Sequence, residues 1–458
     1  LARPRPFQDF EIRNLTSHVV SPYDKGGVPP RLSPRVRAAP LNRMGRFLNF
    51  FLRQGRPPAL DPGGGACHAD GMGLKQDLIA CRGPVAGFAA MGLYWGGFAG
   101  LVPALKARSA LSDEAFGAAM LVSTCGAVAA MLAAPAIERR LGRAALPLLS
   151  VLLAAAFLLP GLAQGAVGFA LARAAAAALV GLLDVVMNAQ VAAIEAARKR
   201  PLMNLAHGVY SFVYAGSATL AGLARQAGAT PLAVFAALGL VTVGLALVMA
   251  RAGGAAPPEP ARRQGRGLGG ALILAGGSIA LIGFLAEQGA EGWSALHLER
   301  SHGASPAAAA IGPALLGLSM GVGRLFGQGL ALRLRGTTLI GLGALMSAAG
   351  AVLAGIAPTL GLAYAGFATL GLGASVLVPT AFAEVAARTP PSQRSAAIAR
   401  LSVIGYAGFF IGPPIMGGLS GAFGLATAFC AVGAILALVP LLITPWLRRS
   451  AAPLSSSG

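Results

Sequence analysis

Apolar stretches of about 20 residues recur from residue 84 towards the C-terminal end of the chain. An α-helix rises about 1.5 Å per residue, so one stretch can cross the roughly 30 Å hydrocarbon layer of a bilayer. Hydrophobic residues make up 55% of the sequence and charged residues only 11%, which leaves little polar surface for a soluble protein. The sequence therefore predicts an all-α membrane protein.

Twelve transmembrane helices are predicted, in two bundles of six. A segment rich in Pro, Gly and Arg, RAGGAAPPEPARRQGRG, separates an N-terminal bundle over 84–250 from a C-terminal bundle over 269–447. Its composition is typical of a polar linker, which we place at 251–268 on the cytoplasmic side. The predicted spans are 84–105, 115–137, 144–163, 166–195, 204–225, 230–250, 269–290, 305–330, 337–357, 359–385, 397–420 and 424–447.

The positions of the Lys and Arg residues indicate membrane topology. The net charge is +20, and of the 36 Lys and Arg residues 13 precede residue 83. Another 17 lie in alternate loops between the predicted spans, and only four lie in the opposite loops. Cytoplasmic loops carry such an excess, whereas a nucleic-acid surface would not follow the spans. We expect a multi-pass protein of the inner membrane, with both termini in the cytoplasm and no nucleic-acid partner.

Residues 1–83 form a different kind of sequence, rich in Arg and Pro and without an apolar run long enough to span. We expect a basic, disordered cytoplasmic tail. The alternative interpretation is that the natural start is Met72, which opens a normal short lead-in to the first span. Residues 448–458 are expected to form a second, short cytoplasmic tail.

The two predicted bundles repeat each other. The loop after span two reads APAIERRLGRAAL and the loop after span eight reads QGLALRLRGTTL. Aligning Gly142 with Gly336 places Arg139 on Arg333, and spans four and ten likewise end in the similar strings EAAR and EVAAR. This six-plus-six repeat is expected of a transporter built from two parallel bundles. The alignment also brings together two serines at the starts of the preceding spans, Ser112 and Ser305.

From about residue 84 to 447 the sequence resembles the major facilitator superfamily. The string RRLGR keeps the later half of the superfamily's signature loop, while Pro135 stands at its first glycine and Arg139 at its acidic position, with Glu138 one place early. The string GYAGFFIGPPIMGG is similar to the superfamily's glycine-proline packing motif. The residues for which we expect gating or conformational roles are Glu138, Arg139, Gly142, Arg143, Glu195, Arg333, Gly336, Glu384, Gly405, Gly408, Gly412 and Pro413.

Within the superfamily, several strings resemble the MosC-like branch, which is associated with rhizopine transport. They are GLLDVVMNAQ, PLMNLAHGVYS, GWSALHL, GRLFGQ, GLGASVLVPTAFAEVAARTP and GYAGFFIGPP. The substrates of this branch are too varied to carry one over to this chain.

Span four carries three charged residues at equal spacing, Arg173, Asp184 and Glu195. Steps of 11 residues turn a helix only about 20° beyond three full turns and advance about 16 Å, so the three share a face but cannot pair. Charges in hydrocarbon are costly, so this face should point into the bundle, with Asn188 one turn beyond Asp184. Asp184 is expected to bind a polar substrate group or a proton, or else to brace a neighbouring helix. Bracing is favoured for Arg173, and a gating or charge-network role for Glu195.

Span seven carries Glu287 and Glu291 on one helix face, followed by Trp293. Two close carboxylates in a low-dielectric site cannot both ionise cheaply, so the pair is a candidate proton carrier. The alternative is a hydrated outer vestibule, because both residues would lie in the outer third of span 269–290, with Trp293 as an anchor in the aromatic belt.

Two further residues are candidates for substrate or proton binding. Arg324 lies inside span eight, where it either counters a buried carboxylate or extends to the inner interface. His207, at the start of span five, can titrate near neutral pH, although such a residue is often only a hydrogen-bonded histidine at a helix end.

These features predict a secondary transporter that moves a small polar solute by alternating access, with proton coupling through Asp184 or the Glu287 and Glu291 pair. The alternatives are an efflux pump for drugs or metabolites, a transport-incompetent sensor, or a lipid-handling protein on the same scaffold. Direct ATP drive is not expected, because the sequence has no P-loop. An enzyme is not expected either, because the sequence has no nucleophile-and-base constellation and no metal-ligand cluster. The four cysteines lack paired spacing, so no metal site is expected. No cofactor is expected, and the chain is expected to be monomeric.

Overall fold

The computed structural model describes residues 76, 78–198, 202–252, 270–390 and 393–449. These residues are almost entirely helical and contain no strand. The predicted tail up to residue 75 with Met72, most of the predicted linker, and residues 450–458 lie outside the described residues.

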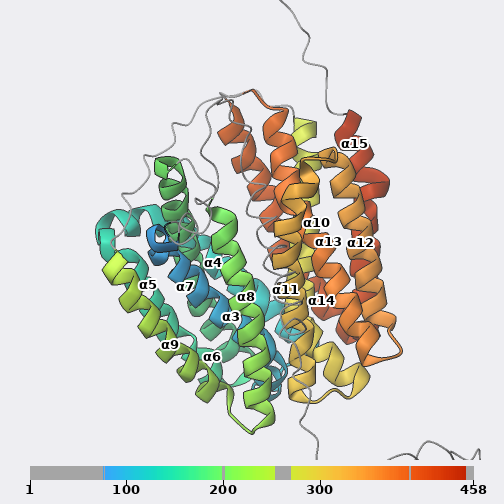
Figure 1. Cartoon of the computed structure of the whole chain (residues 1–458). Coiled ribbons are helices and arrows are strands. Elements are labelled where there is room, and N and C mark those ends of the chain that lie inside the picture. Colours follow the sequence, from blue (N-terminus) through green and yellow to red (C-terminus); the bar gives the residue numbers. More distant parts are fainter. Residues whose placement is uncertain (1–75, 77, 199–201, 253–269, 391–392, 450–458) are drawn as a thin grey trace, which may run out of the picture. The chain divides into compact units, whose positions relative to one another are not determined.

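The helices form two groups along the chain, which Figure 1 distinguishes by colour. The N-terminal half contains α3 Arg82–Arg108, α4 Asp113–Leu141, α5 Ala145–Ala156, α6 Leu158–Leu162, α7 Gly165–Arg198, α8 Met203–Gln226 and α9 Pro231–Ala252. The C-terminal half contains α10 Gly270–His302, α11 Pro306–Ala331, α12 Gly336–Ile356, α13 Leu360–Ala387, α14 Arg394–Leu438, a π-helical turn Val439–Ile443 and α15 Thr444–Arg449.

The described helices have the lengths and composition of membrane spans. Nine helical stretches of the described residues are long and apolar enough to cross a bilayer, and two of them, Asp113–Leu162 and Ala396–Arg449, each cover two predicted spans. The helix α8 covers predicted span five but is not among the nine, because its polar residues lower its mean hydropathy. An all-α membrane protein is confirmed, while the number of twelve crossings stays a prediction.

Two glycines break these long stretches at the predicted boundaries. Gly142 has φ 52° and ends α4, where a 3₁₀ turn Gly142–Ala144 leads into α5. Gly424 has φ 83° inside α14, at the start of predicted span twelve. Positive φ is a region that only glycine enters at little cost, so these two positions fix where the chain turns.

The repeated serines at the starts of spans two and eight have the same structural role. Ser112 precedes α4 and its hydroxyl accepts a hydrogen bond from the Ala115 amide at 3.1 Å. Ser305 precedes α11 and accepts one from the Ala308 amide at 3.4 Å. Both are helix N-caps, which satisfy amides that the first turn leaves without partners.

The helix α10 continues to His302, beyond the predicted end of span seven at residue 290. Charged residues after Ala290 suggested a loop by their hydropathy. In the structure Glu291 is buried, and both Glu299 and Arg300 form ion pairs with residues of the N-terminal half. Since one of these charges is buried in the protein and the other two are paired with charges of the other half, the helix can carry them at little cost.

Large apolar side chains are exposed along several helices. Leu132 is 83% exposed, Leu240 75% and Val167 73%. Water would penalise so many exposed apolar side chains, whereas lipid tails would not, so this surface fits a hydrocarbon environment.

The two halves contact each other mainly through two helix pairs. The helix α8 packs against α11, and α4 packs against α14, while α3 contacts α10 and α11 more lightly. These helices therefore bound the space in which residues of both halves can meet.

Candidate substrate cavity

A cavity of about 600 Å³ lies between the N-terminal half and the C-terminal half. Its walls come from α3, α4, α7 and α8 on one side and from α10, α11 and α14 on the other. All seven residues predicted to bind substrate or protons line it, although their roles remain predictions. They are Arg173, Asp184, Asn188, His207, Glu287, Glu291 and Arg324.

Asp184 is held by its own helix rather than by another one. The Asn188 side-chain amide donates to the Asp184 carbonyl oxygen at 2.8 Å and to its Oδ1 at 3.0 Å. The spacing of one turn that placed Asn188 beside Asp184 therefore produces a direct contact. No cation of the described residues pairs with Asp184, so one side of its carboxylate is available to the cavity.

The three charged residues of the predicted stripe on α7 lie in two different environments. Arg173 and Asp184 line the cavity, but Glu195 does not. Its Oε1 accepts hydrogen bonds from the Leu202 amide at 2.5 Å and the Met203 amide at 2.7 Å, at the first turn of α8. Glu195 thus stabilises the start of the next helix, where a carboxylate meets free amides and the positive end of the helix dipole.

Two carboxylates on α10 face the cavity with different partners. The Glu287 Oε1 lies 3.5 Å from the Arg324 Nη2 of α11, so Arg324 counters a buried carboxylate rather than extending to the interface. Glu291 has no such cation, and its Oε2 accepts a hydrogen bond from the Gln288 amide at 3.3 Å. The pair is therefore asymmetric, with one carboxylate opposite a cation and one beside a neutral amide.

The length of α10 places these carboxylates nearer the middle of their helix than the predicted span 269–290 did, while the hydrated outer vestibule stays an alternative. Because α10 runs from Gly270 to His302, Glu287 and Glu291 lie in the middle of the helix and not in its outer third. Trp293 is not an aromatic-belt anchor either, since it is fully buried and packs edge-to-face on Phe116 of α4, with ring centroids 5.1 Å apart.

Aromatic rings complete the cavity wall. Phe284 stacks on Phe409 with ring centroids 4.4 Å apart and on Tyr406 at 5.6 Å. In the N-terminal half, His207 packs edge-to-face against Phe88 at 4.8 Å. A solute in this cavity would meet charged groups set into an apolar and aromatic surface.

Comparisons with known proteins agree with this arrangement. The profile described as Major Facilitator Superfamily matches residues 277–457. An uncharacterised MFS-type transporter of Yersinia pestis is 30% identical over 354 residues, which cover 76% of this chain and 91% of that protein. The chain belongs to the major facilitator superfamily.

Two further comparisons concern the branch of the superfamily and the fold. The membrane protein MosC of Rhizobium meliloti is 28% identical over 351 residues, 76% of this chain and 86% of MosC, which confirms the predicted MosC-like branch. The solved inward-open structure of the xylose transporter XylE from E. coli has a TM-score of 0.63 at 14% identity and covers 81% of this chain and 95% of that chain. That likeness shows the superfamily fold.

The superfamily signature loop carries one buried acid and several exposed arginines. Glu138 is buried at the end of α4, next to Gln190 of α7. Arg139, Arg143 and Arg333 are exposed, and none forms an ion pair with another residue that the structure describes. The interdomain charge lock that the superfamily implies at this loop stays a prediction.

The corresponding loop of the C-terminal half is tied within that half. Glu384 forms an ion pair with Arg388 one turn along α13, and its carboxylate lies directly against Gly336, where a Cβ would clash with it. Arg388 also donates to the Leu447 carbonyl of α15 at 2.9 Å. Glu384 thus fastens α12, α13 and α15 at the end that the sequence predicts to be cytoplasmic.

The glycine-proline motif on α14 packs on two neighbours. Gly405, Gly408 and Gly412 face α10 of the same half, and a Cβ on Gly408 would clash with the Leu281 carbonyl. Pro413 faces the other half, where its carbonyl lies 2.6 Å from the place of a Cβ on Gly117 of α4. The small residues therefore allow α14 to approach both α10 and α4 closely.

Two ion pairs that the sequence did not predict join the halves at the predicted outer end. Asp113, which begins α4, accepts hydrogen bonds from Arg300 of α10 at 2.8 and 3.0 Å and from the Ser420 hydroxyl of α14. Lys106 lies 2.8 Å from the same carboxylate. We call Asp113, Lys106, Arg300 and Ser420 the Asp113 cluster.

The second ion pair joins α8 to the same turn of α10. The Arg225 Nη2 lies 2.6 Å from the Glu299 Oε1. Residues 299 and 300 therefore reach α8 and α4 from neighbouring positions. Glu299 and Arg300 are adjacent residues of opposite charge near the end of α10, which was a usable signal in the sequence. The sequence could not identify their partners.

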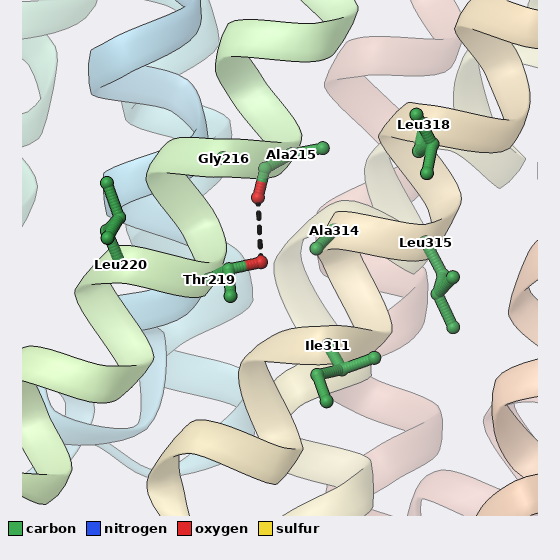
Figure 2. Close-up of a pocket in the computed structure, with 8 residues that line it drawn as sticks. All are labelled: Ala215, Gly216, Thr219, Leu220, Ile311, Ala314, Leu315 and Leu318. Carbon is green, nitrogen blue, oxygen red and sulfur yellow. Dashed lines mark hydrogen bonds between the residues drawn. The ribbon is translucent and has the colours of Figure 1, made fainter. Parts of the chain in front are cut away.

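A separate apolar hollow lies on the seam between α8 and α11, as Figure 2 shows. Leu220, Ile311, Leu315 and Leu318 line it, and its Thr219 hydroxyl donates to the Ala215 carbonyl of its own helix at 2.9 Å. It shares no lining residue with the charged cavity. Without a free polar group, this hollow is a poor site for a polar solute.

Proposed function

We propose that this superfamily transporter carries a small polar solute across the inner membrane by alternating access, coupled to protons. The observation that supports it most strongly is the cavity between the halves, which collects seven charged or polar residues from four helices. Charges are costly inside a membrane protein and are kept where they bind ions or substrates. Substrate sites between the two halves fit the alternating-access mechanism of such repeats.

The contacts between the halves support an inward-facing state. The Asp113 cluster and the Arg225–Glu299 pair join the halves at the predicted outer end. Among the described residues, no ion pair joins the halves at the opposite end. With the arginine-rich loops in the cytoplasm, the cavity would be closed to the outside and would open inwards.

Proton coupling is proposed to use Asp184, Glu287 and Glu291. Asp184 and Glu291 are each held by a neutral amide, so each can exchange a proton without losing a cation partner. Protonation of Glu287 would release Arg324 to another partner. A proton can therefore change which charges face the solute, and this is how binding and transport become linked.

A transport experiment tests this proposal in two stages. Thermal-shift screening of the purified protein against sugars, cyclitols, amino acids and organic acids first identifies a solute, because a bound ligand stabilises the fold. Flux of that solute is then measured in proteoliposomes with and without an imposed proton gradient. We expect the gradient to drive accumulation in the wild type but not in Asp184→Asn, Glu287→Gln or Glu291→Gln.

The matched control is Glu114→Gln, which neutralises an exposed carboxylate outside the cavity. It should retain gradient-driven flux. The coupling mechanism is wrong if flux ignores both the proton gradient and all three cavity substitutions. A protein that binds a solute but shows no flux under any gradient would instead favour the sensor alternative.

A further inference from the structure

Arg173 is a buried cation without a hydrogen-bond acceptor among the described residues. It lies in the first third of α7, its side chain is fully buried, and it lines the charged cavity. Its three guanidinium nitrogens have no hydrogen-bond partner among the described residues. No carboxylate of those residues forms an ion pair with it, so no described anionic group of the protein balances its charge.

Aromatic rings are the groups that surround this guanidinium. Its central carbon lies 4.0 Å from the ring centroid of Phe98 and 5.4 Å from that of Trp95, both on α3. Cation–π contacts recover part of the lost hydration, but they satisfy none of the five N–H donors. A buried guanidinium without acceptors costs free energy, so its retention calls for an acceptor that the protein itself does not supply.

The other cavity charges cannot supply that acceptor. Arg324 already forms an ion pair with Glu287. The side-chain amides of Gln288 and Asn188 donate hydrogen bonds to Glu291 and Asp184. Asp184 is 11 residues away on the same helix, about 16 Å along the axis, which is beyond contact. Arg173 therefore differs from Arg324, the other cavity arginine, because only Arg324 already has a carboxylate in the protein.

We propose that Arg173 binds a carboxylate group of the transported solute, so that the substrate class is small organic carboxylates with an apolar body. This inference rests on the proposed transport function of the cavity. A guanidinium matches a carboxylate with two parallel hydrogen bonds, which one unpaired arginine can provide. A doubly charged phosphate would call for more cations, and the second cavity arginine is already paired.

The wall near Arg173 fits the apolar body of such a solute. Met91 and Trp95 of α3 and Met120 of α4 line the same cavity. Trp95 is only partly buried and contacts the guanidinium, whereas Phe98 behind it is buried. Trp95 is the side chain that an incoming carboxylate would displace to reach Arg173, and this movement gives an optical signal.

Binding to the purified full chain tests the proposal independently of transport. The probes are benzoate, phenylacetate and hexanoate, each compared with its neutral amide at equal millimolar concentration, with thermal stability and tryptophan fluorescence as readouts. We expect the carboxylates to raise the melting temperature and change the fluorescence, and the amides to do neither. In Arg173→Gln the affinity for the carboxylates should fall by about tenfold or more, the loss expected for charge-assisted hydrogen bonds.

Two further variants keep the test decisive. Arg173→Lys retains the charge without the planar fork and should weaken carboxylate binding even if Arg173→Gln fails to fold. Arg400→Gln removes an exposed arginine outside the cavity and should bind like the wild type. The proposal is overturned if no carboxylate binds the wild type, if amides bind equally well, or if both folded Arg173 variants bind like the wild type. Loss of proton-driven flux with carboxylate binding intact would refute only the coupling mechanism.

Discussion

Removing Asp113 should release the contact between the two halves at the predicted outer end. Its carboxylate accepts hydrogen bonds from Arg300 and Ser420 of the other half. Asp113 is 8% exposed, but the Arg300 side chain is 45% exposed, so solvent screens part of the attraction. We therefore take the low end of the range for charge-assisted hydrogen bonds, and expect Asp113→Asn to weaken the contact by about 1–2 kcal/mol.

The weaker contact between the halves changes the populations of the closed and open states. A change of about 1.4 kcal/mol is a factor of ten, so the state closed at this end should lose roughly five- to thirty-fold in population relative to the open state. Spin labels at Ala227 and Phe423, one exposed position on each half at this end, report the change as a distance distribution. Asp113→Asn should shift weight to longer distances.

Two controls separate this effect from a general loss of stability. Glu384→Gln breaks an ion pair within one half and should leave the Ala227–Phe423 distances unchanged. A double-mutant cycle of Asp113→Asn and Arg300→Gln should show positive coupling, because both changes remove the same contact. Unchanged distances in Asp113→Asn, together with zero coupling in the cycle, would refute the role of the Asp113 cluster.

Three further predictions concern the same fold. Glu195→Gln should lower the free energy of unfolding by about 1 kcal/mol in chemical denaturation, because a neutral amide accepts less strongly from the first amides of α8; an unchanged midpoint would contradict this capping role. Gly408→Ala should cost about 1–3 kcal/mol, since its Cβ would clash with the Leu281 carbonyl, whereas Gly418→Ala, with nothing within 4 Å, should be neutral; equal melting temperatures would disprove the close packing. Glu287→Gln should abolish proton-driven accumulation yet leave solute exchange at zero gradient, and loss of both would show that Glu287 serves binding instead.

Some features of the site were readable from sequence because they depend on local spacing. Asn188 follows Asp184 by one helical turn, and that spacing predicts a shared helix face, on which the structure shows a hydrogen bond between the two side chains. Residue chemistry also selected seven of the polar side chains that line the cavity, since charged and polar groups inside an apolar span must avoid lipid. The repeat likewise predicted equivalent positions for Ser112 and Ser305, which are both N-caps.

Pairing between helices was not readable, because the partner of a charge is set by which helices face each other. The sequence favoured a bracing role for Arg173, yet the structure gives this side chain aromatic neighbours and no hydrogen-bond acceptor from the described parts of the chain. It also treated Arg300 as a loop charge, whereas Arg300 extends α10 and reaches Asp113 across the boundary between the halves.

The sequence by itself determined the environment of the chain and the residues that must be shielded from lipid. Hydropathy and the distribution of arginines are properties of single segments, and a bilayer selects helices on those properties alone. Only the tertiary structure decided how those residues act, because helices separated by 187 residues, such as those of Asp113 and Arg300, become neighbours only when the two halves pack. That packing placed Glu195 at a helix start, Arg324 beside Glu287, and Arg173 among aromatic rings, without a hydrogen-bond acceptor in the part of the chain that the structure describes.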